Sequence, residues 1–214
     1  MKDSKEKQMK DDSIKTISGT MIPVYGEDID TDRIIPARYM KALDFNKLGQ
    51  YAFVDERASF QRQGKTHPMD DARFNNASIL IAGRNFGCGS SREHAVQALL
   101  RSGIQAVIGE SFGEIFRGNS VSAGMPCFTA SASVIQELQS QAEMNPQQMV
   151  EIDVAGGNLS IAGRSFELSM PQGMVNRFIS GGWNQLNRLR DAEPEIENVA
   201  RSLPYMQWGS GLSV

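Results

Sequence analysis

The sequence predicts a single α/β domain with a mostly parallel core sheet flanked by helices plus antiparallel additions. Between residues 79 and 142, three short apolar runs each precede a segment with helical spacing. Such a repeat implies parallel strands with helices over the faces of the sheet. After residue 150, two apolar runs flank Ala155-Gly156-Gly157-Asn158, which is a hairpin signal. A length of 214 residues with 40% hydrophobic residues suffices for one buried core and is short for two.

Individual elements follow from the spacing of apolar residues. Ile79-Leu80-Ile81 is a continuous apolar run of the buried-strand kind, and Ala95, Val96, Leu99 and Leu100 then recur at helical spacing before Gly103, a helix C-terminal signal. Strands are expected at residues 21–25, 79–82, 106–108, 126–128, 150–154 and 159–161, an extended segment at 166–168, and helices at 92–102, 111–119 and 133–142.

Composition excludes several classes of function. A formal charge of −3, from 22 basic and 25 acidic side chains, gives no footprint for nucleic acid or an anionic membrane. No apolar run is long enough to span a bilayer, and residues 1–16 lack the apolar stretch of a signal peptide, so we expect a cytoplasmic protein. Cys88 and Cys127 are the only cysteines, too few for a disulfide framework or a complete iron–sulfur cluster.

Three regions are expected along the chain. Residues 1–16 are expected to form a disordered charged tail, because ordering them would bury too little apolar surface to offset the entropy lost. The folded domain is expected to span residues 17–190, followed by a C-terminal extension at 191–214. Near its start, residues 26–33 carry four acidic side chains and predict an exposed loop.

The most informative stretch is the Gly-rich loop, residues 85–94, because it lies between a buried strand and a helix N-terminus. Ligand sites of open α/β sheets collect at the carboxyl ends of the strands. Gly87 and Gly89 would let backbone N–H groups approach an anion, which the helix N-terminus also favours. Arg92 adds a planar fork of donors suited to a carboxylate or a phosphate.

Other interpretations of this loop remain open from the residues alone. Ser90 and Glu93 fit a capping box, which requires no function. Cys88 and His94 can be imagined as a thiol nucleophile and its base, although a lone cysteine more often packs as a small hydrophobe. The loop lacks the third glycine of a dinucleotide fingerprint, the Lys-Ser/Thr ending of a phosphate loop and the glycine order of a serine-hydrolase elbow.

Three motifs resemble the aconitase superfamily, and more closely the small subunits of bacterial 3-isopropylmalate dehydratases. They are GCGSSREHA at residues 87–95, DIDTDRIIP at 28–36 and GESFGEIFRGN at 109–119. The resemblance covers residues 17–190 and implies the swivelling β/β/α domain of that superfamily.

The resemblance also implies an activity and its residues. It implies one half of a hydro-lyase of leucine biosynthesis, acting on a small 2-hydroxy dicarboxylate. This chain would bind no cofactor, and an iron–sulfur cluster would lie on a large-subunit partner. By similarity, Ser90 is the general base, Ser91 and Arg92 bind a substrate carboxylate, and Asp32 lies at the active site.

One segment departs from the aconitases and concerns specificity. Where they carry a substrate-binding arginine, this chain has Tyr39, Met40, Lys41 and Leu43. An apolar substituent such as isopropyl would fit there better than a third carboxylate, although these residues can also simply pack a helix start. The related substrates citraconate, dimethylmalate and homoaconitate stay open, as does a non-catalytic anion-binding module.

The remaining large or titratable side chains have structural interpretations. His94 is expected to hold the loop against its helix, and His67, beside Pro68, is expected at the surface. Trp183 is expected in the core, whereas Tyr205 and Trp208 are candidates for docking on a partner chain.

Overall fold

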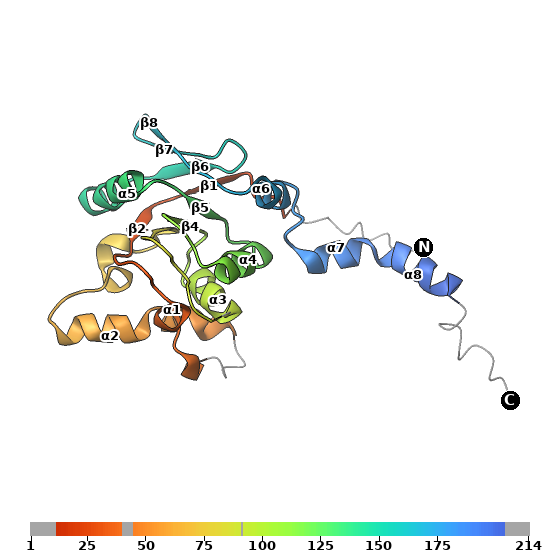
Figure 1. Ribbon diagram of the computed structural model, residues 1–214, viewed down its shortest axis with the longest axis horizontal. Helices are drawn as coiled ribbons and strands as arrows, with labels where there is room; N and C mark the ends of the chain where they lie inside the picture. Colours follow the sequence, from red (N-terminus) through yellow and green to blue (C-terminus); the bar gives the residue numbers. More distant parts are fainter. Residues whose placement is uncertain (1–11, 40–44, 91, 204–214) are drawn as a thin grey trace, which may run out of the picture. The chain divides into compact units, whose positions relative to one another are not determined.

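A parallel sheet of four strands in the order β2-β3-β4-β5 forms the centre of the fold (Figure 1). In the structure, a computed structural model that describes residues 12–39, 45–90 and 92–203, these strands are almost entirely buried. Helices on both sides of the sheet explain the continuous apolar runs. The strands are β2 (Met21–Pro23), β3 (Ile79–Ile81), β4 (Ala106–Gly109) and β5 (Cys127–Thr129).

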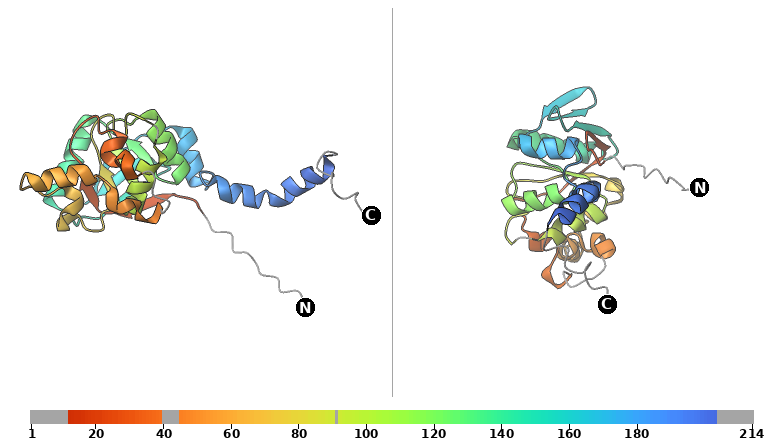
Figure 2. Two further views of the ribbon diagram at one scale, coloured as in Figure 1. Left: turned by 90° about the horizontal axis from the view of Figure 1, so that it is seen from below. Right: turned by 90° about the vertical axis from the view of Figure 1, so that its right-hand side faces the viewer.

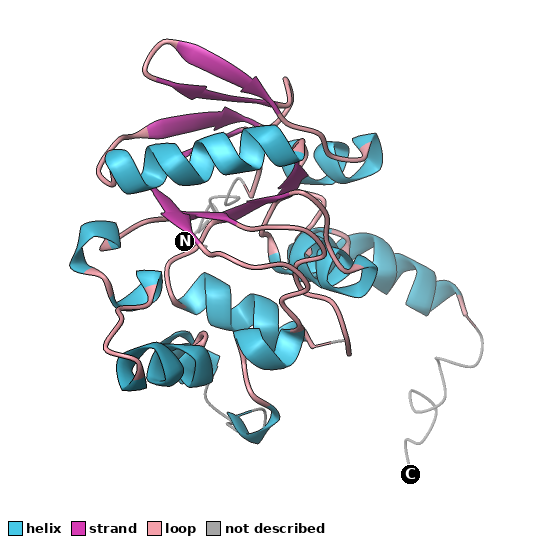
Figure 3. Cartoon of the chain, turned by 60° about the vertical axis from the view of Figure 1, so that its left-hand side comes forward, coloured by secondary structure: helices cyan, strands magenta, loops and turns pink. Residues whose placement is uncertain are grey.

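Three helices connect and cover these strands. They are α3 (Glu93–Arg101), α4 (Glu114–Ala123) and α5 (Ala132–Met144). Helix α5 lies over β2 and β3 on one side of the sheet, and α3 and α4 pack together on the other (Figures 1 and 3). The predicted parallel core with helices on its faces is therefore confirmed.

An antiparallel sheet forms a second layer beyond α5 (Figure 2). Its strands, in the spatial order β1-β6-β7-β8, are β1 (Thr16–Gly19), β6 (Val150–Asp153), β7 (Asn158–Ile161) and β8 (Arg164–Glu167). Buried and exposed residues alternate along β1 and β6, as in a sheet with one face toward the core. The predicted hairpin is present, because β6 pairs with β7 in antiparallel register.

The long connection from β2 to β3 carries short helical pieces. They are α1 (Thr31–Ile34), the 3-10 helices η1 (Ala37–Tyr39) and η2 (Phe45–Tyr51), α2 (Val54–Arg62), and the 3-10 helices η3 (Pro68–Asp70) and η4 (Ala72–Phe74). Segment η2 packs so tightly on the end of α3 that a Cβ at Gly49 would lie 2.3 Å from the carbonyl oxygen of Arg101.

Residues near both ends of the first 183 positions are tied to the folded core. Residues 12–16, assigned to the tail, make main-chain contacts: Ile14 N–H donates to the carbonyl of Phe178 in α6 (Gln172–Ile179) at 2.8 Å. Trp183 packs against the core, as predicted, and its indole N–H donates to the carbonyl of Asp12 at 2.7 Å. The Trp183 ring also fills the space beside Gly124, where a Cβ would approach it to 2.5 Å.

The chain divides into two compact units, residues 1–183 and 184–214. Helices α7 (Gln185–Asp191) and α8 (Glu193–Ser202) belong to the second unit. Tyr205 and Trp208, the docking candidates, lie outside the described residues. Within the described ranges, no helix has the length and apolar character to cross a membrane.

The expected helix at residues 111–119 is shifted toward the C-terminus and runs as α4 from Glu114 to Ala123. Residues 111–113 instead form main-chain hydrogen bonds with the Gly-rich loop. The N–H of Phe86 donates to the carbonyl of Ser111 at 3.0 Å, and the N–H of Gly113 donates to the carbonyl of Phe86 at 2.9 Å.

Candidate active site

The Gly-rich loop leaves the carboxyl end of β3 and is held between the segments that follow β2 and β4. On the β2 side, Gly87 N–H donates to the carbonyl of Ile29 at 2.7 Å, and Thr31 N–H donates to the carbonyl of Cys88 at 3.0 Å. On the β4 side lie the two bonds between Phe86 and residues 111 and 113. The three motifs therefore meet at one edge of the parallel sheet, where ligand sites of such sheets collect.

Glycine is required where this loop packs on α4. Gly87 has a φ of +74°, and a Cβ there would lie 2.2 Å from Cγ of Phe116. A Cβ on Gly113 would lie 2.5 Å from the carbonyl oxygen of Gly87. The loop backbone at Gly87 thus packs on the Phe116 ring of α4, with no room for a further side chain at Gly87.

The acidic segment after β2 is only partly the exposed loop that was expected. Glu27 and Asp28 are exposed, and Glu27 forms an ion pair with Arg84 at 2.7 Å. The second half of the acidic segment forms helix α1. The side chain of Asp30 caps this helix by accepting the N–H of Arg33 at 2.8 Å. Ile29 and Thr31 are 1% and 2% exposed, so the expectation of an exposed loop was wrong at these two residues, whereas Asp32 is exposed.

Asp32 and Arg92, two of the predicted site residues, form an ion pair and hydrogen bond between Oδ1 and Nη1. The Arg92 side chain is 13% exposed and the Asp32 side chain 53% exposed. The hydrogen bond from Arg92 is the main cause that lowers the pKa of Asp32, which stays ionised near neutral pH. A carboxylate is thus already seated on the arginine fork of the candidate site.

Ser90 does not cap the helix, so the capping-box interpretation was wrong. Helix α3 begins at Glu93 with Arg92 as its N-cap residue, and among the described residues no side chain makes a capping hydrogen bond to it. The carbonyl of Ser90 instead accepts a hydrogen bond from the hydroxyl of Thr31, at 2.9 Å. Ser90 is exposed, and within the described part of the chain its hydroxyl has no hydrogen-bond partner.

Of the other predicted site residues, the structure describes Tyr39. Ser91, Met40, Lys41 and Leu43 lie outside the described residues. Tyr39 is half-buried, and its ring stacks on that of Tyr51 with 4.0 Å between centroids.

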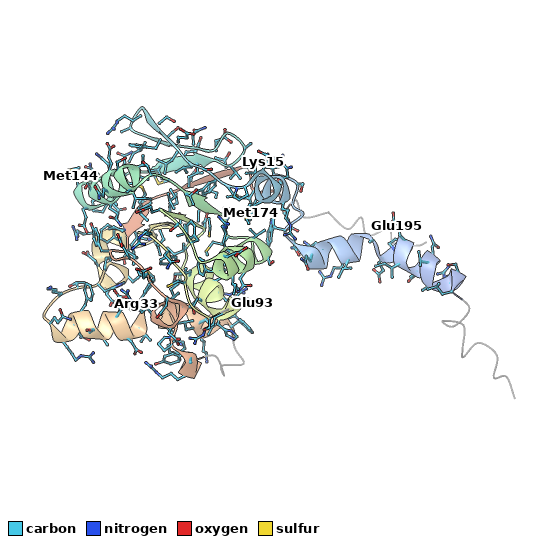
Figure 4. The ribbon with its side chains drawn as sticks, in the orientation of Figure 1. Lys15, Arg33, Glu93, Met144, Met174 and Glu195 are labelled. Atoms are coloured by element: carbon cyan, nitrogen blue, oxygen red, sulfur yellow. The ribbon has the colours of Figure 1, made fainter. Side chains whose placement is uncertain are left out.

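The two residues of the alternative thiol pair have other environments. Burial raises the pKa of the half-buried Cys88 thiol, and the nearby carboxylates of Asp30 and Asp28 raise it further. A reactive thiol needs the opposite shift. The ring of His94 stacks on Phe45 with 5.3 Å between centroids, so it packs η2 against the start of α3. Arg33 and Glu93, labelled in Figure 4, mark the elements α1 and α3 that carry the ion pair.

The expected surface position of His67 was wrong. His67 is 2% exposed, and its ring packs against those of Phe53 and Phe60. Its Nδ1 accepts the N–H of Met69 at 3.1 Å. Burial is the main cause that lowers the pKa of His67. Both ring partners lie in or next to α2, and only the fold of the turn between α2 and η3 brings His67 back onto them.

The chemistry of this edge suits an anion more than a metal ion. Among the described residues, no group of three or more His, Cys, Asp or Glu side chains is arranged to hold a metal ion. Arg92 and the uncapped N-terminus of α3 instead offer N–H donors beside an exposed hydroxyl. Thr31, which no sequence pattern singled out, joins this group through its bonds to residues 88 and 90.

Comparisons with known proteins agree on one family. Residues 12–132 match the aconitase C-terminal domain. The 3-isopropylmalate dehydratase small subunit of Synechocystis is 42% identical over 195 residues, covering 91% of this chain and 96% of the relative. That of Thermus thermophilus is 43% identical over 189 residues, covering 88% and 94%. A solved 3-isopropylmalate dehydratase from Methanocaldococcus jannaschii superposes with a TM-score of 0.64 at 28% identity, covering 86% of this chain and 98% of the other.

Proposed function

Because the chain belongs to the family of 3-isopropylmalate dehydratase small subunits, we propose that it forms one half of an isopropylmalate isomerase active site. The complete enzyme is a hydro-lyase of leucine biosynthesis. It interconverts 2-isopropylmalate and 3-isopropylmalate by dehydration and rehydration. A small subunit requires a large-subunit partner, and we place the binding of a substrate carboxylate and the proton transfer on this chain.

The observation that carries this proposal is the arrangement at the carboxyl edge of the parallel sheet. There an exposed serine, Ser90, lies two residues from Arg92, on a loop held by both neighbouring motifs. Proton abstraction next to a carboxylate requires a group that binds the carboxylate and a base beside it. The Arg92 guanidinium and the exposed Ser90 hydroxyl are candidates for these two roles.

The proposed carboxylate clamp consists of Arg92, Ser91 and the N-terminus of α3. A guanidinium has five N–H donors, and the recorded bond to Asp32 uses one of them. The remaining donors can hold a substrate carboxylate in the bidentate geometry that a lysine cannot reproduce. The uncapped N–H groups of α3 favour negative charge at the same place.

The proposed general base is Ser90. Its deprotonated oxygen would take the proton from the carbon next to a substrate carboxylate, and the hydroxyl so formed would return a proton to the neighbouring carbon on rehydration. A serine hydroxyl is a very weak acid, so its deprotonated form needs strong local stabilisation. Arg92 and the helix N-terminus supply positive potential for this purpose.

Asp32 is better suited to act through Arg92 than to bind substrate directly. An ionised Asp32 would repel a substrate carboxylate, whereas its contact with Nη1 orients the fork. We therefore assign Asp32 as a positioning residue within the substrate-binding group.

For substrate specificity we propose the segment that contains Tyr39, Met40, Lys41 and Leu43. The supporting observation is that Tyr39 follows the motif of α1 directly and presents a ring packed on Tyr51. An isopropyl group beside such a surface loses contact with water, which a polar third carboxylate would not tolerate.

The iron–sulfur cluster is proposed to lie on the large subunit, since this chain offers two cysteines, of which Cys127 is buried. When bound there, its iron supplies Lewis-acid chemistry toward the departing hydroxyl. Both cysteines of this chain are free, which suits a reducing compartment, and we propose the cytoplasm.

The test is reconstitution with a purified, cluster-loaded large subunit. Absorbance of the unsaturated intermediate is followed with 2-isopropylmalate, citraconate and dimethylmalate as substrates, and homoaconitate is tested in parallel. We expect the highest kcat/KM with 2-isopropylmalate and no activity from this chain alone. A preference for another hydroxy acid would reassign the substrate, and no activity on any of them would favour an anion-binding module.

A further inference from the structure

Thr31, the first residue of α1, makes two bonds to the Gly-rich loop. Its hydroxyl donates to the carbonyl oxygen of Ser90 at 2.9 Å, and its N–H donates to the carbonyl oxygen of Cys88 at 3.0 Å. The residue is 2% exposed, so water does not compete readily for the hydroxyl. A buried hydroxyl that faces one specific carbonyl fixes the position of that peptide group.

The next residue of α1 holds the same loop two positions further on. Asp32 contacts Arg92, so α1 binds the loop at residue 90 and at residue 92. Gly89 precedes Ser90 with a φ of +88°, and α3 begins after Arg92 without a side-chain cap.

The Ser90 side chain depends on its backbone for orientation. Its hydroxyl has no hydrogen-bond partner among the residues that the structure describes, and the side chain is exposed. The direction of Cα–Cβ at Ser90 therefore limits the positions that Oγ can reach by rotation about χ1. Catalytic groups are sensitive to displacements of about 1 Å, which can cost roughly a hundredfold in rate.

We propose that Thr31 is a positioning residue that sets the orientation of Ser90 for proton abstraction. The inference rests on the proposed function, because it requires Ser90 to act as the base. Thr31 does not touch the substrate in this scheme; its hydroxyl holds the Ser90 peptide while Asp32 holds the Arg92 fork. Helix α1 thereby fixes the positions of both the base, Ser90, and the carboxylate clamp at Arg92.

The test compares substitutions of Thr31 in the reconstituted two-subunit enzyme. Thr31→Val removes the hydroxyl and keeps the shape, and Thr31→Ser restores the donor without the methyl group. Thr20→Val is the matched control, because Thr20 is also buried but precedes β2, at the opposite edge of the sheet. Thr31→Ala serves as a second hydroxyl-free variant that introduces no new branch.

We expect Thr31→Val and Thr31→Ala to lower kcat roughly tenfold with KM changed less than about twofold, because the base is displaced while the carboxylate clamp is kept. Thr31→Ser and Thr20→Val should keep kcat close to that of the wild type. A purely structural role would lower the amount of active complex without this split between kcat and KM, or would be equally severe in Thr31→Ser. Either result overturns the inference, as does a wild-type kcat in Thr31→Val.

A double-mutant cycle separates this inference from the proposed function. In the Ser90→Ala background, adding Thr31→Val should change the residual rate by less than about twofold, because Thr31 acts through the missing hydroxyl. If Ser90→Ala itself retains the wild-type rate, the base assignment fails. If Ser90→Ala is inactive while Thr31→Val is normal, the base assignment stands and only the role of Thr31 fails.

Discussion

The guanidinium of Arg92 is bonded to the carboxylate of Asp32, a residue 60 positions earlier in the chain. The two side chains come from different motifs, on α1 and at the start of α3. Parallel β2 and β3 end at the same edge of the sheet, which is why these motifs meet. The pair joins the acidic loop to the Gly-rich loop, and we place the carboxylate clamp on it.

Substrate binding should depend on the planar shape of the Arg92 guanidinium as well as on its positive charge. Arg92→Lys keeps the charge but loses bidentate geometry, so KM for 2-isopropylmalate should rise by about ten- to a hundredfold, as for a lost charge-assisted bond. Asp32→Asn should raise KM by a smaller factor, because Arg92 remains but is held less firmly. Steady-state kinetics of the reconstituted enzyme measure both.

Glu137→Gln is the matched control for this pair. It removes a carboxylate from the exposed ion pair with Arg164, between α5 and β8, and should leave KM unchanged. An unchanged KM in Arg92→Lys would contradict the clamp.

Tight packing of the Gly-rich loop predicts a large cost for a single methyl group. Gly87→Ala places a Cβ against Phe116 in addition to forcing alanine to a φ of +74°. Gly64→Ala is the matched control, because Gly64 has a φ of +69° with no atom within 4 Å of the added Cβ. We expect Gly64→Ala to cost about 1 kcal/mol of unfolding free energy and Gly87→Ala about 1–3 kcal/mol more.

Urea denaturation of the isolated chain measures that difference. Equal costs for the two variants would show that the loop does not lie directly on α4.

Burial of His67 predicts a pH-dependent stability. Its pKa is lower in the folded chain than the ordinary 6.5, so the unfolded chain binds the proton more readily. The stabilising contribution is therefore complete above pH 6.5 and is lost as the pH falls through and below that value. His67→Asn retains an acceptor for the N–H of Met69 but does not titrate.

The measurement is the melting temperature between pH 5 and 8. The variant should melt lower at pH 7.5, because it lacks the ring contacts with Phe53 and Phe60. Its melting temperature should also fall less steeply below pH 6.5 than that of the wild type. Parallel curves for the two proteins would contradict a buried neutral histidine.

A partner that completes the site must cover the edge where the three motifs meet. Ile115, in the first turn of α4 beside this edge, is 51% exposed. Ile115→Glu should weaken binding of the large subunit at least about tenfold, because a charge would be buried in the contact. Met144→Glu is the control: Met144 is 64% exposed but ends α5, away from Glu93 of α3 (Figure 4).

Titration calorimetry with the large subunit compares the two variants. Equal dissociation constants for Ile115→Glu and the wild type would place the partner elsewhere on the chain.

Local patterns predicted the elements well where one run of residues decides the structure. The apolar run at Ile79–Ile81 and the helical spacing from Ala95 to Leu100 are both found as expected. Prediction failed where distant residues compete for the same backbone. The carbonyl of Ser111 accepts the N–H of Phe86 in the Gly-rich loop, and α4 begins only at Glu114; α3 likewise begins at Glu93 with Arg92, not Ser90, as its N-cap residue.

The residues of the candidate site remain a prediction from the sequence, whereas their contacts were found only in the structure. The resemblance of three motifs indicated Ser90, Arg92 and Asp32, and parallel strand order explains why these residues share one edge. No spacing along the chain could indicate that Asp32 binds Arg92, or that Thr31 holds the main chain of Ser90. Such contacts depend on how two loops pack, which a single sequence does not encode locally.

The central claim is that Ser90 supplies the base for a site completed by the large subunit. Ser90→Ala, with Ser140→Ala on α5 as control, is measured for turnover of 2-isopropylmalate, melting temperature and large-subunit affinity. We predict at least a hundredfold lower kcat for Ser90→Ala, in line with the ~10²–10⁴ that general bases contribute, with melting temperature and affinity unchanged. A wild-type kcat in Ser90→Ala would contradict the account.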